Sequence, residues 1–88
     1  MDDANRTVIA KALGVEEGAR NIRFILKSLN AIGAGTIQSA ELTNEGGDKA
    51  INLVAEGGAR YRVYLSGSGS VDSVQSLDTG EWLVKSER

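Results

Sequence analysis

The first third of the chain repeats its apolar residues at helical spacing. A separation of three or four residues places side chains on one side of an α-helix, and that separation links Val15, Ala19, Ile22, Leu26 and Leu29. Ile25 and Ile32 widen the stripe, and Arg20, Arg23, Lys27 and Asn30 fall largely opposite it. The pattern predicts an amphipathic helix over about residues 16–32, ended by Gly33 and Gly35.

Two acids and an earlier apolar cluster complete the helical part. Glu16 and Glu17 would occupy the first turn of the longer helix, where carboxylates complement the positive end of the helix dipole. Before them, one side of a shorter helix is formed by Val8, Ile9, Ala12 and Leu13, and Gly14 can cap it. We therefore expect residues 3–32 to contain a short helix followed by a longer one.

After residue 36 the apolar spacing changes to two, which is the period of a β-strand. The clearest alternation sets Tyr61, Val63 and Leu65 against Arg60, Arg62 and Tyr64, and a second sets Ile51, Leu53 and Ala55 against Asn52, Val54 and Glu56. In the first predicted strand, Ala40 and Leu42 are expected to face inward. Two more strands are expected from Val71 to Leu77 and from Trp82 to Lys85.

Glycine-rich turns separate these strands. They fall at residues 44–48, 57–58, 66–70 and 78–80, and glycine readily adopts the positive φ angles that tight turns require. Consecutive strands joined by such short turns are antiparallel, because a parallel crossover needs a dozen or more residues. The second part of the chain is therefore predicted to be a meander.

The predicted fold class is α+β. We expect two N-terminal helices packed on one face of a four- or five-stranded antiparallel meander sheet, with the other face left to water. The stripe from Ile22 to Leu29 should lie against Ile51, Leu53, Val63 and Leu65. At 88 residues the chain is expected to form a single domain over 1–88, with a helical part at 3–32 and the antiparallel sheet at 36–86.

From about Leu42 onward the sequence resembles the PepSY-like domains, which are small bacterial modules with a helix packed on an antiparallel sheet. Three segments carry the resemblance: Tyr61-Arg62-Val63-Tyr64-Leu65; Gly69-Ser70-Val71 with Val74; and Asp78-Thr79-Gly80-Glu81-Trp82-Leu83. Asp78 directly precedes Thr79, whereas the family's turn is commonly longer. The helix–helix–meander order also looks like one repeat of the β-lactamase inhibitory protein. Both resemblances imply binding or restraint of a partner, and the first implies an extracytoplasmic protein.

Composition excludes several classes of function. The chain has no histidine and no cysteine, so it lacks the commonest general base, the thiol nucleophile and the usual zinc ligands. Its acids fall in turns and at helix starts, where capping and turn formation would place them anyway. We therefore predict no enzyme, no metal site and no cofactor. Apart from the resemblance, the residues do not indicate the cellular compartment. They also do not indicate whether the chain is part of a larger protein.

Charge and hydropathy exclude two kinds of partner. Ten basic and twelve acidic residues give a formal charge of −2, whereas nucleic-acid binders usually carry a basic surplus. No apolar stretch approaches the roughly 20 residues needed to cross a bilayer. The expected partner is therefore another protein or a second copy of the chain, with no nucleic acid and no membrane insertion.

The candidate partner-binding residues are Arg60, Arg62, Tyr64 and Trp82. The first three share one side of a strand, and arginine, tyrosine and tryptophan are enriched at interface hot spots. The alternative is that Trp82 belongs to the core and that the other three are ordinary solvated residues. The predicted function is a non-enzymatic protein-binding or regulatory module, acting through the open sheet face or an edge strand. The alternative function is a structural unit that forms a homodimer or packs on a neighbouring domain.

Overall fold

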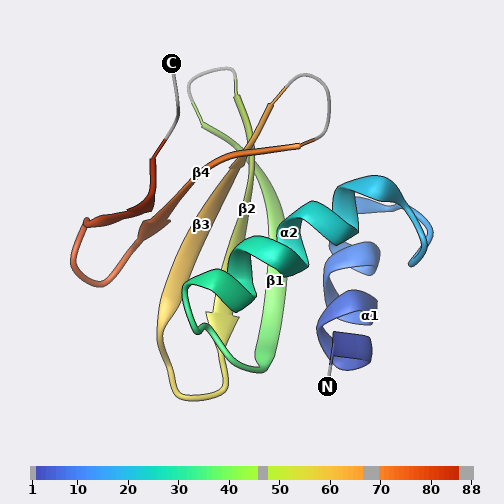
Figure 1. Ribbon diagram of the computed structural model, residues 1–88, viewed down its shortest axis with the longest axis horizontal. Helices are drawn as coiled ribbons and strands as arrows, with labels where there is room; N and C mark the ends of the chain where they lie inside the picture. The colour runs from blue at the N-terminus through green and yellow to red at the C-terminus, as the bar shows by residue number, and fades with distance from the viewer. Residues whose placement is uncertain (1, 46–47, 67–69, 86–88) are drawn as a thin grey trace.

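Two helices lead into a five-stranded antiparallel sheet whose strands lie side by side in chain order (Figure 1). The computed structural model describes residues 2–45, 48–66 and 70–85. The elements are α1 (Asp2–Leu13), α2 (Arg20–Ala31), β1 (Ile37–Glu45), β2 (Asp48–Ala55), β3 (Arg60–Leu65), β4 (Val71–Ser76) and β5 (Trp82–Val84). The predicted α+β class and the meander are confirmed, with five strands.

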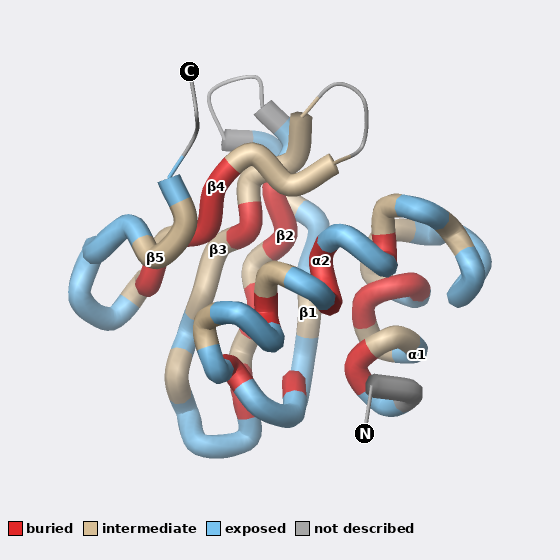
Figure 2. Tube along the Cα trace, in the orientation of Figure 1, coloured by how far each residue is buried: buried red, intermediate tan, exposed pale blue. Residues whose placement is uncertain are grey.

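The core lies between the helices and one face of the sheet. In Figure 1, α2 crosses in front of the strands and α1 lies beside β1, and in Figure 2 the buried segments follow the inner sides of these elements. The buried residues of α2 are Ile22, Ile25, Leu26 and Leu29. They join one cluster with Ile9 of α1 and with Ile51, Leu53, Val63 and Val74 of the sheet, and Leu65 packs against that cluster. The predicted pairing of helix stripe and sheet face is confirmed.

The start of the second helix was predicted four residues too early. The helix begins at Arg20, and the preceding Ala19 is extended (φ −63°, ψ 146°) with no side-chain cap. Glu16 and Glu17 therefore precede the helix, and no acid lies in its first turn. Glu17 instead connects to α1: its carboxylate accepts from the Thr7 hydroxyl at 3.0 Å.

Glycine ends both helices as predicted, because its positive φ is open to few other residues. Gly14 (φ 70°) follows α1, and Gly33 (φ 68°) follows α2. The Gly33 N–H donates to the Asn30 carbonyl, and the next N–H, of Ala34, donates to the Leu29 carbonyl. Val15 lies beyond the first of these turns and is exposed, so its predicted place in the α2 stripe was wrong.

A register shift in β1 changes which of its residues face the core. Ile37 pairs with Ala55, but Ser39 pairs with Val54, so one extra residue is accommodated between them. The bulge lets both Ile37 and Ala40 face the helices, which simple alternation does not permit. Leu42 pairs with the buried Ile51 and so points to the predicted side, yet it is exposed.

Asn5 is a buried polar residue that joins α1 to the start of β1. It is only 6% exposed. Its Nδ2 donates to the Gly35 carbonyl at 3.0 Å, and its Oδ1 accepts from the Ile37 N–H at 2.8 Å. One side chain thus satisfies a donor and an acceptor of the backbone that connects the helices to the sheet.

Some expectations fall where the structure gives no description. The structure does not describe residues 46–47 and 67–69, so the predicted turns at 44–48 and 66–70 lie partly outside the described residues. The predicted end of the sheet at residue 86 also lies outside them. Among the described residues, no helix is long and apolar enough to cross a membrane.

Candidate interaction surface

The face of the sheet opposite the helices carries all four residues predicted to bind a partner. Cross-strand partners share a face and neighbours along a strand alternate between faces. Because Val63 is in the core, its neighbours Arg62 and Tyr64 point away from the helices, and so does Arg60. Trp82 pairs with Gln75, which pairs with Arg62, so Trp82 lies on the same side. We call this side of the sheet the outer face.

A row of polar side chains crosses the outer face from edge to edge. The register aligns, in strand order, Glu41, Asn52, Arg62, Gln75 and Trp82. Within the row, Arg62 Nε donates to Asn52 Oδ1 at 2.8 Å. Gln75 Nε2 donates to the Gly80 carbonyl at 3.0 Å, in the turn that leads to Trp82. The arginine and the tryptophan are therefore held by their neighbours.

Trp82 contacts Tyr64 across the strand that separates them. The ring centroids are 5.5 Å apart and the ring planes are inclined at 37°. This separation is within the 4.5–7 Å range of favourable aromatic pairs. Trp82 remains 43% exposed and does not belong to the core cluster. Of the two places that the sequence left open for Trp82, the structure therefore has it on the outer face.

Small buried residues flank Tyr64 and make room for this ring pair. Ala50 on β2 and Ser73 on β4 both pair with Tyr64. Both are buried although they lie on the outer face, and Ala50 is not part of the core cluster between sheet and helices. A phenol ring between two short side chains covers them both. The aromatic pair thus forms a supported apolar platform beside Arg62.

Arg60 lies at the end of the outer face and is engaged by the turn between β4 and β5. Its Nε donates to Asp78 Oδ1 at 2.9 Å, and its backbone N–H donates to Asp78 Oδ2 at 3.0 Å. Both side chains are partly exposed, at 56% and 41%. The backbone hydrogen bond, and then the guanidinium, lower the pKa of Asp78 below its usual value. Arg60 therefore anchors the turn that precedes Trp82.

The lowered pKa of Asp78 predicts a pH dependence of stability. A carboxyl whose pKa is lower in the folded state stabilises the fold above its unfolded-state pKa, and this contribution disappears as pH falls through the folded-state pKa. We expect Asp78→Asn to have a lower Tm than the wild-type protein at about pH 6, and the difference to shrink toward zero as pH falls through the folded-state pKa of Asp78. Thermal unfolding followed by circular dichroism at decreasing pH tests it, with Glu56→Gln, at an exposed position, as the control. A Tm difference that does not change with pH contradicts the assignment.

The helical side of the molecule carries a second polar surface, to which the sequence assigned no role. Arg20, Arg23 and Lys27 lie along the exposed side of α2. Arg23 and Lys27 line a hollow of about 280 Å³ together with Arg6 of α1, and a second hollow of about 410 Å³ with Arg20 and Phe24. The helical spacing of these cations was visible in the sequence, but the contribution of Arg6 required the packing of α1 beside α2.

Comparison with known proteins gives no relative from which a function can be transferred. No protein-family model matches the chain, and no curated protein or solved structure matches it. In the part of the chain that the structure describes, no group of three or more acidic, histidine or cysteine side chains could hold a metal ion. The function is therefore argued from the surfaces themselves.

Proposed function

We propose that the protein is a non-enzymatic binding module that contacts a protein partner through its outer face. The observation that carries this proposal is the half-exposed Trp82 ring packed at a tilt against Tyr64, next to Arg62. An aromatic pair that is ordered before binding loses little conformational entropy in an interface. Tryptophan, tyrosine and arginine are also the residues that most often dominate binding energy.

The surroundings of the aromatic pair suit a polypeptide partner. Polar groups of Gln75, Asn52 and Glu41 lie in the row that runs from Trp82 across the sheet, and they offer both donors and acceptors beside the apolar platform, as the polar rim of a protein interface does. Arg60 would contribute at the edge of the contact, where it also holds the turn that precedes Trp82.

The resemblance to PepSY-like domains supports the same class of function. It covers β3 and the turn that leads into β5, the segments that carry Arg62, Tyr64 and Trp82. On this basis we propose that the partner is an extracytoplasmic protein whose activity the module restrains.

Two substitutions test the outer face. Tyr64→Ala removes half of the aromatic pair, and Arg62→Glu reverses the neighbouring charge. We expect each to weaken binding at least tenfold, a loss of about 1.4 kcal/mol or more. The wild-type protein, fixed to a resin, is first used to capture a partner from an extract of its native cells. The captured protein is then purified, and calorimetry measures its Kd for the wild type and for each variant.

A matched control separates the outer face from the rest of the surface. Val15→Ala shortens an exposed apolar side chain in the segment between α1 and α2, outside the sheet, and should leave Kd within about twofold of the wild-type value. If Tyr64→Ala and Arg62→Glu both bind the purified partner as the wild type does, the outer face is not the binding site.

One feature favours the alternative of self-association. β1 is a nine-residue edge strand whose second edge has no strand partner among the described residues, and Leu42 on it is exposed. Unpaired edges of this length can pair with a second copy. Sedimentation velocity at micromolar concentration distinguishes the two functions: a dimer that Leu42→Lys dissociates favours the assembly unit, and a monomer favours the binding module.

A further inference from the structure

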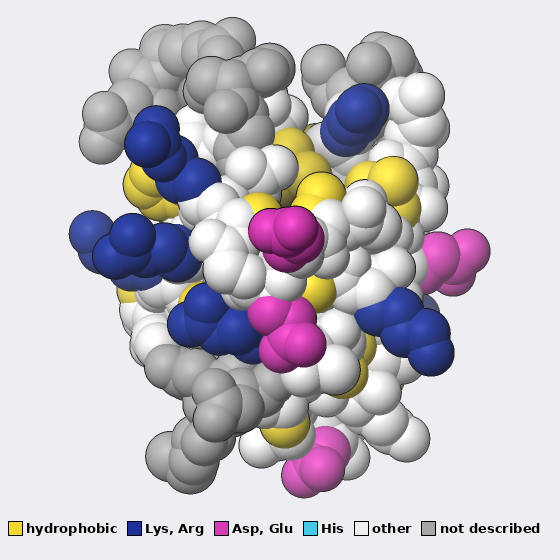
Figure 3. Space-filling view, turned by 90° about the vertical axis from the view of Figure 1, so that its right-hand side faces the viewer, with side chains coloured by type: hydrophobic (Ala, Val, Ile, Leu, Met, Phe, Trp, Pro, Cys, Tyr) yellow, Lys and Arg dark blue, Asp and Glu magenta, His cyan; other side chains and the backbone are white. Residues whose placement is uncertain are grey.

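The exposed side of α2 carries cations and no acids. Arg20, Arg23 and Lys27 follow one another at intervals of three and four residues, so they lie along a single line of the helix. The helix contains neither aspartate nor glutamate. In Figure 3, which views the molecule from the side of α1, Lys and Arg side chains lie toward both margins of the face, and Asp and Glu side chains lie between them. We call Arg6, Arg20, Arg23 and Lys27 the basic helix face.

These cations form no ion pair with the side chains that the structure describes. The ion pair of Arg60 and Asp78 lies elsewhere, at the outer face of the sheet. Arg6 donates to a backbone carbonyl, that of Glu17, at 3.0 Å. A chain with a formal charge of −2 thus gathers four cations on one part of its surface.

The position of these cations opposes the stability of the helix. The N-terminal end of a helix is the positive end of its dipole, and cations there are unfavourable. Arg20 is the first residue of α2 and Arg23 lies in its first turn, where no acid is present. Residues that work against local stability are commonly found where function requires them.

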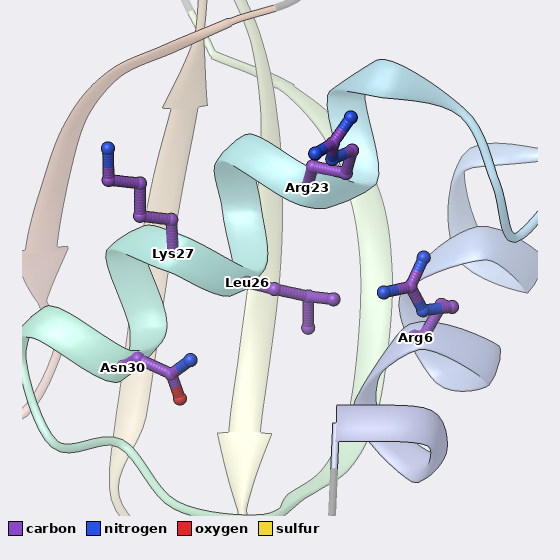
Figure 4. Close-up of a pocket in the computed structure, with 5 residues that line it drawn as sticks. All are labelled: Arg6, Arg23, Leu26, Lys27 and Asn30. Atoms are coloured by element: carbon purple, nitrogen blue, oxygen red, sulfur yellow. The ribbon is translucent and has the colours of Figure 1, made fainter.

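Hollows beside the cations provide room for a ligand. The hollow of about 280 Å³ is lined by Arg6, Arg23, Leu26, Lys27 and Asn30. Figure 4 shows Leu26 of α2 and Arg6 of α1 pointing toward one another across it. The second hollow, of about 410 Å³, adds Phe24, which is 40% exposed. Each hollow thus combines guanidinium or ammonium groups with one apolar side chain.

We infer that the basic helix face binds a short acidic protein segment that carries apolar side chains. Carboxylates of the segment pair with Arg23 and Lys27, and its apolar side chains enter beside Phe24 and Leu26. This second contact lies on the other side of the sheet from the outer face, so the module is able to bind both surfaces at once. The inference does not depend on the function proposed for the outer face.

Charge and apolar area favour a protein segment over other anionic partners. An interfacial helix buries a whole apolar side in a membrane, but the apolar side of α2 is already in the core and only Phe24 is exposed. A nucleic acid presents a long run of phosphates, which would meet the exposed Glu16 and Glu17 next to α2. A short segment can be confined to Arg23 and Lys27, which lie about one and two turns beyond the first residue of α2.

The test uses a fluorescein-labelled synthetic peptide rich in glutamate with two leucines, and a matched peptide with glutamine in place of glutamate. Fluorescence anisotropy measures the affinity of the whole protein for each. We expect binding of the acidic peptide only, weakened at least tenfold by the double variant Arg23→Glu/Lys27→Glu. The control Lys11→Glu/Lys49→Glu makes the same change in net charge elsewhere and should change Kd by less than about twofold.

A third variant separates loss of binding from loss of folding. Arg20→Glu places an acid in the first turn of α2, so it should raise Tm while it weakens peptide binding. Tyr64→Ala should leave peptide binding unchanged. The inference is overturned if the wild type does not bind the acidic peptide, if the control variant loses as much affinity, or if Tyr64→Ala abolishes binding. It is also overturned if phosphatidylserine vesicles or a single-stranded oligonucleotide bind more tightly than the peptide and lose that binding in Arg23→Glu/Lys27→Glu.

Discussion

Replacement of Ile25 by alanine is expected to lower the free energy of unfolding by about 2–5 kcal/mol, the range for large-to-small changes at fully buried aliphatic sites. Ile25 has no exposed surface and lies in the middle of the α2 stripe. A domain of this size has a total stability on the order of 5 kcal/mol, so about 0–3 kcal/mol should remain in the variant at 25 °C. Urea denaturation followed by far-ultraviolet circular dichroism measures the change.

The adjacent residue on the same helix provides the control. Phe24→Ala removes a larger side chain, but one that is 40% exposed and outside the core cluster, so we expect a smaller loss of about 1 kcal/mol or less. Both variants introduce alanine, which equalises the effect on helix propensity. If Phe24→Ala destabilises the protein more than Ile25→Ala, the packing of α2 on the sheet is wrong.

Removal of the Asn5 side chain is expected to have the second largest effect. Asn5→Ala leaves the buried Ile37 N–H and the part-buried Gly35 carbonyl without their partners; a buried polar group left unpaired costs about 1–3 kcal/mol, and one that water can reach costs less. We expect a total loss of about 2–4 kcal/mol in urea denaturation. Hydrogen exchange at the Ile37 amide should also accelerate more than exchange at Val63, because the opening is local.

A conservative variant divides this effect between the two hydrogen bonds. Asn5→Asp keeps an acceptor for the Ile37 N–H but loses the donor to Gly35. Its Ile37 amide should therefore stay protected when the variant is folded. Equal exchange rates at this amide in Asn5→Ala and Asn5→Asp would count against the bond between Ile37 and Asn5.

The elements with strong periodicity could be predicted from the sequence. In α2, the spacing of Ile22, Leu26 and Leu29 is typical of a helix with one buried side, so the same pattern predicted both the helix and the side that packs on the sheet. In β3, the alternation of Val63 with Arg62 and Tyr64 identified both the strand and its outer face. Short glycine turns then determined the antiparallel order.

Features set by backbone geometry could not be predicted in this way. Alternation alone gives no sign of the bulge after Ile37, which depends on the register with β2. The early start predicted for α2 came from apolar spacing that continues back to Val15, although the chain turns at Gly14 and again before Arg20. Alternation correctly places Leu42 on the helix side of the sheet. It does not tell which part of that side the helices cover, so the exposure of Leu42 could not be predicted.

The candidate surfaces were partly visible in advance. Arg62 and Tyr64 were identified from alternation, whereas the position of Trp82 required the register of β5 on β4. Asn5 was missed, although one signal was present: it lies four residues before Ile9, on the apolar side of the predicted first helix. A polar residue in such a stripe usually indicates a buried hydrogen bond.

The order of the strands in the sheet has a consequence for how the chain reaches its native state. Every pair of neighbouring strands is consecutive in sequence, so each hairpin closes a short loop at little entropic cost. Pairings of this kind keep contact order low, which is the property that correlates with rapid folding. The chain has no proline, so refolding also lacks the slow step that cis–trans isomerisation imposes. The two surfaces proposed to bind partners therefore become available as soon as the hairpins have assembled and the helices have docked.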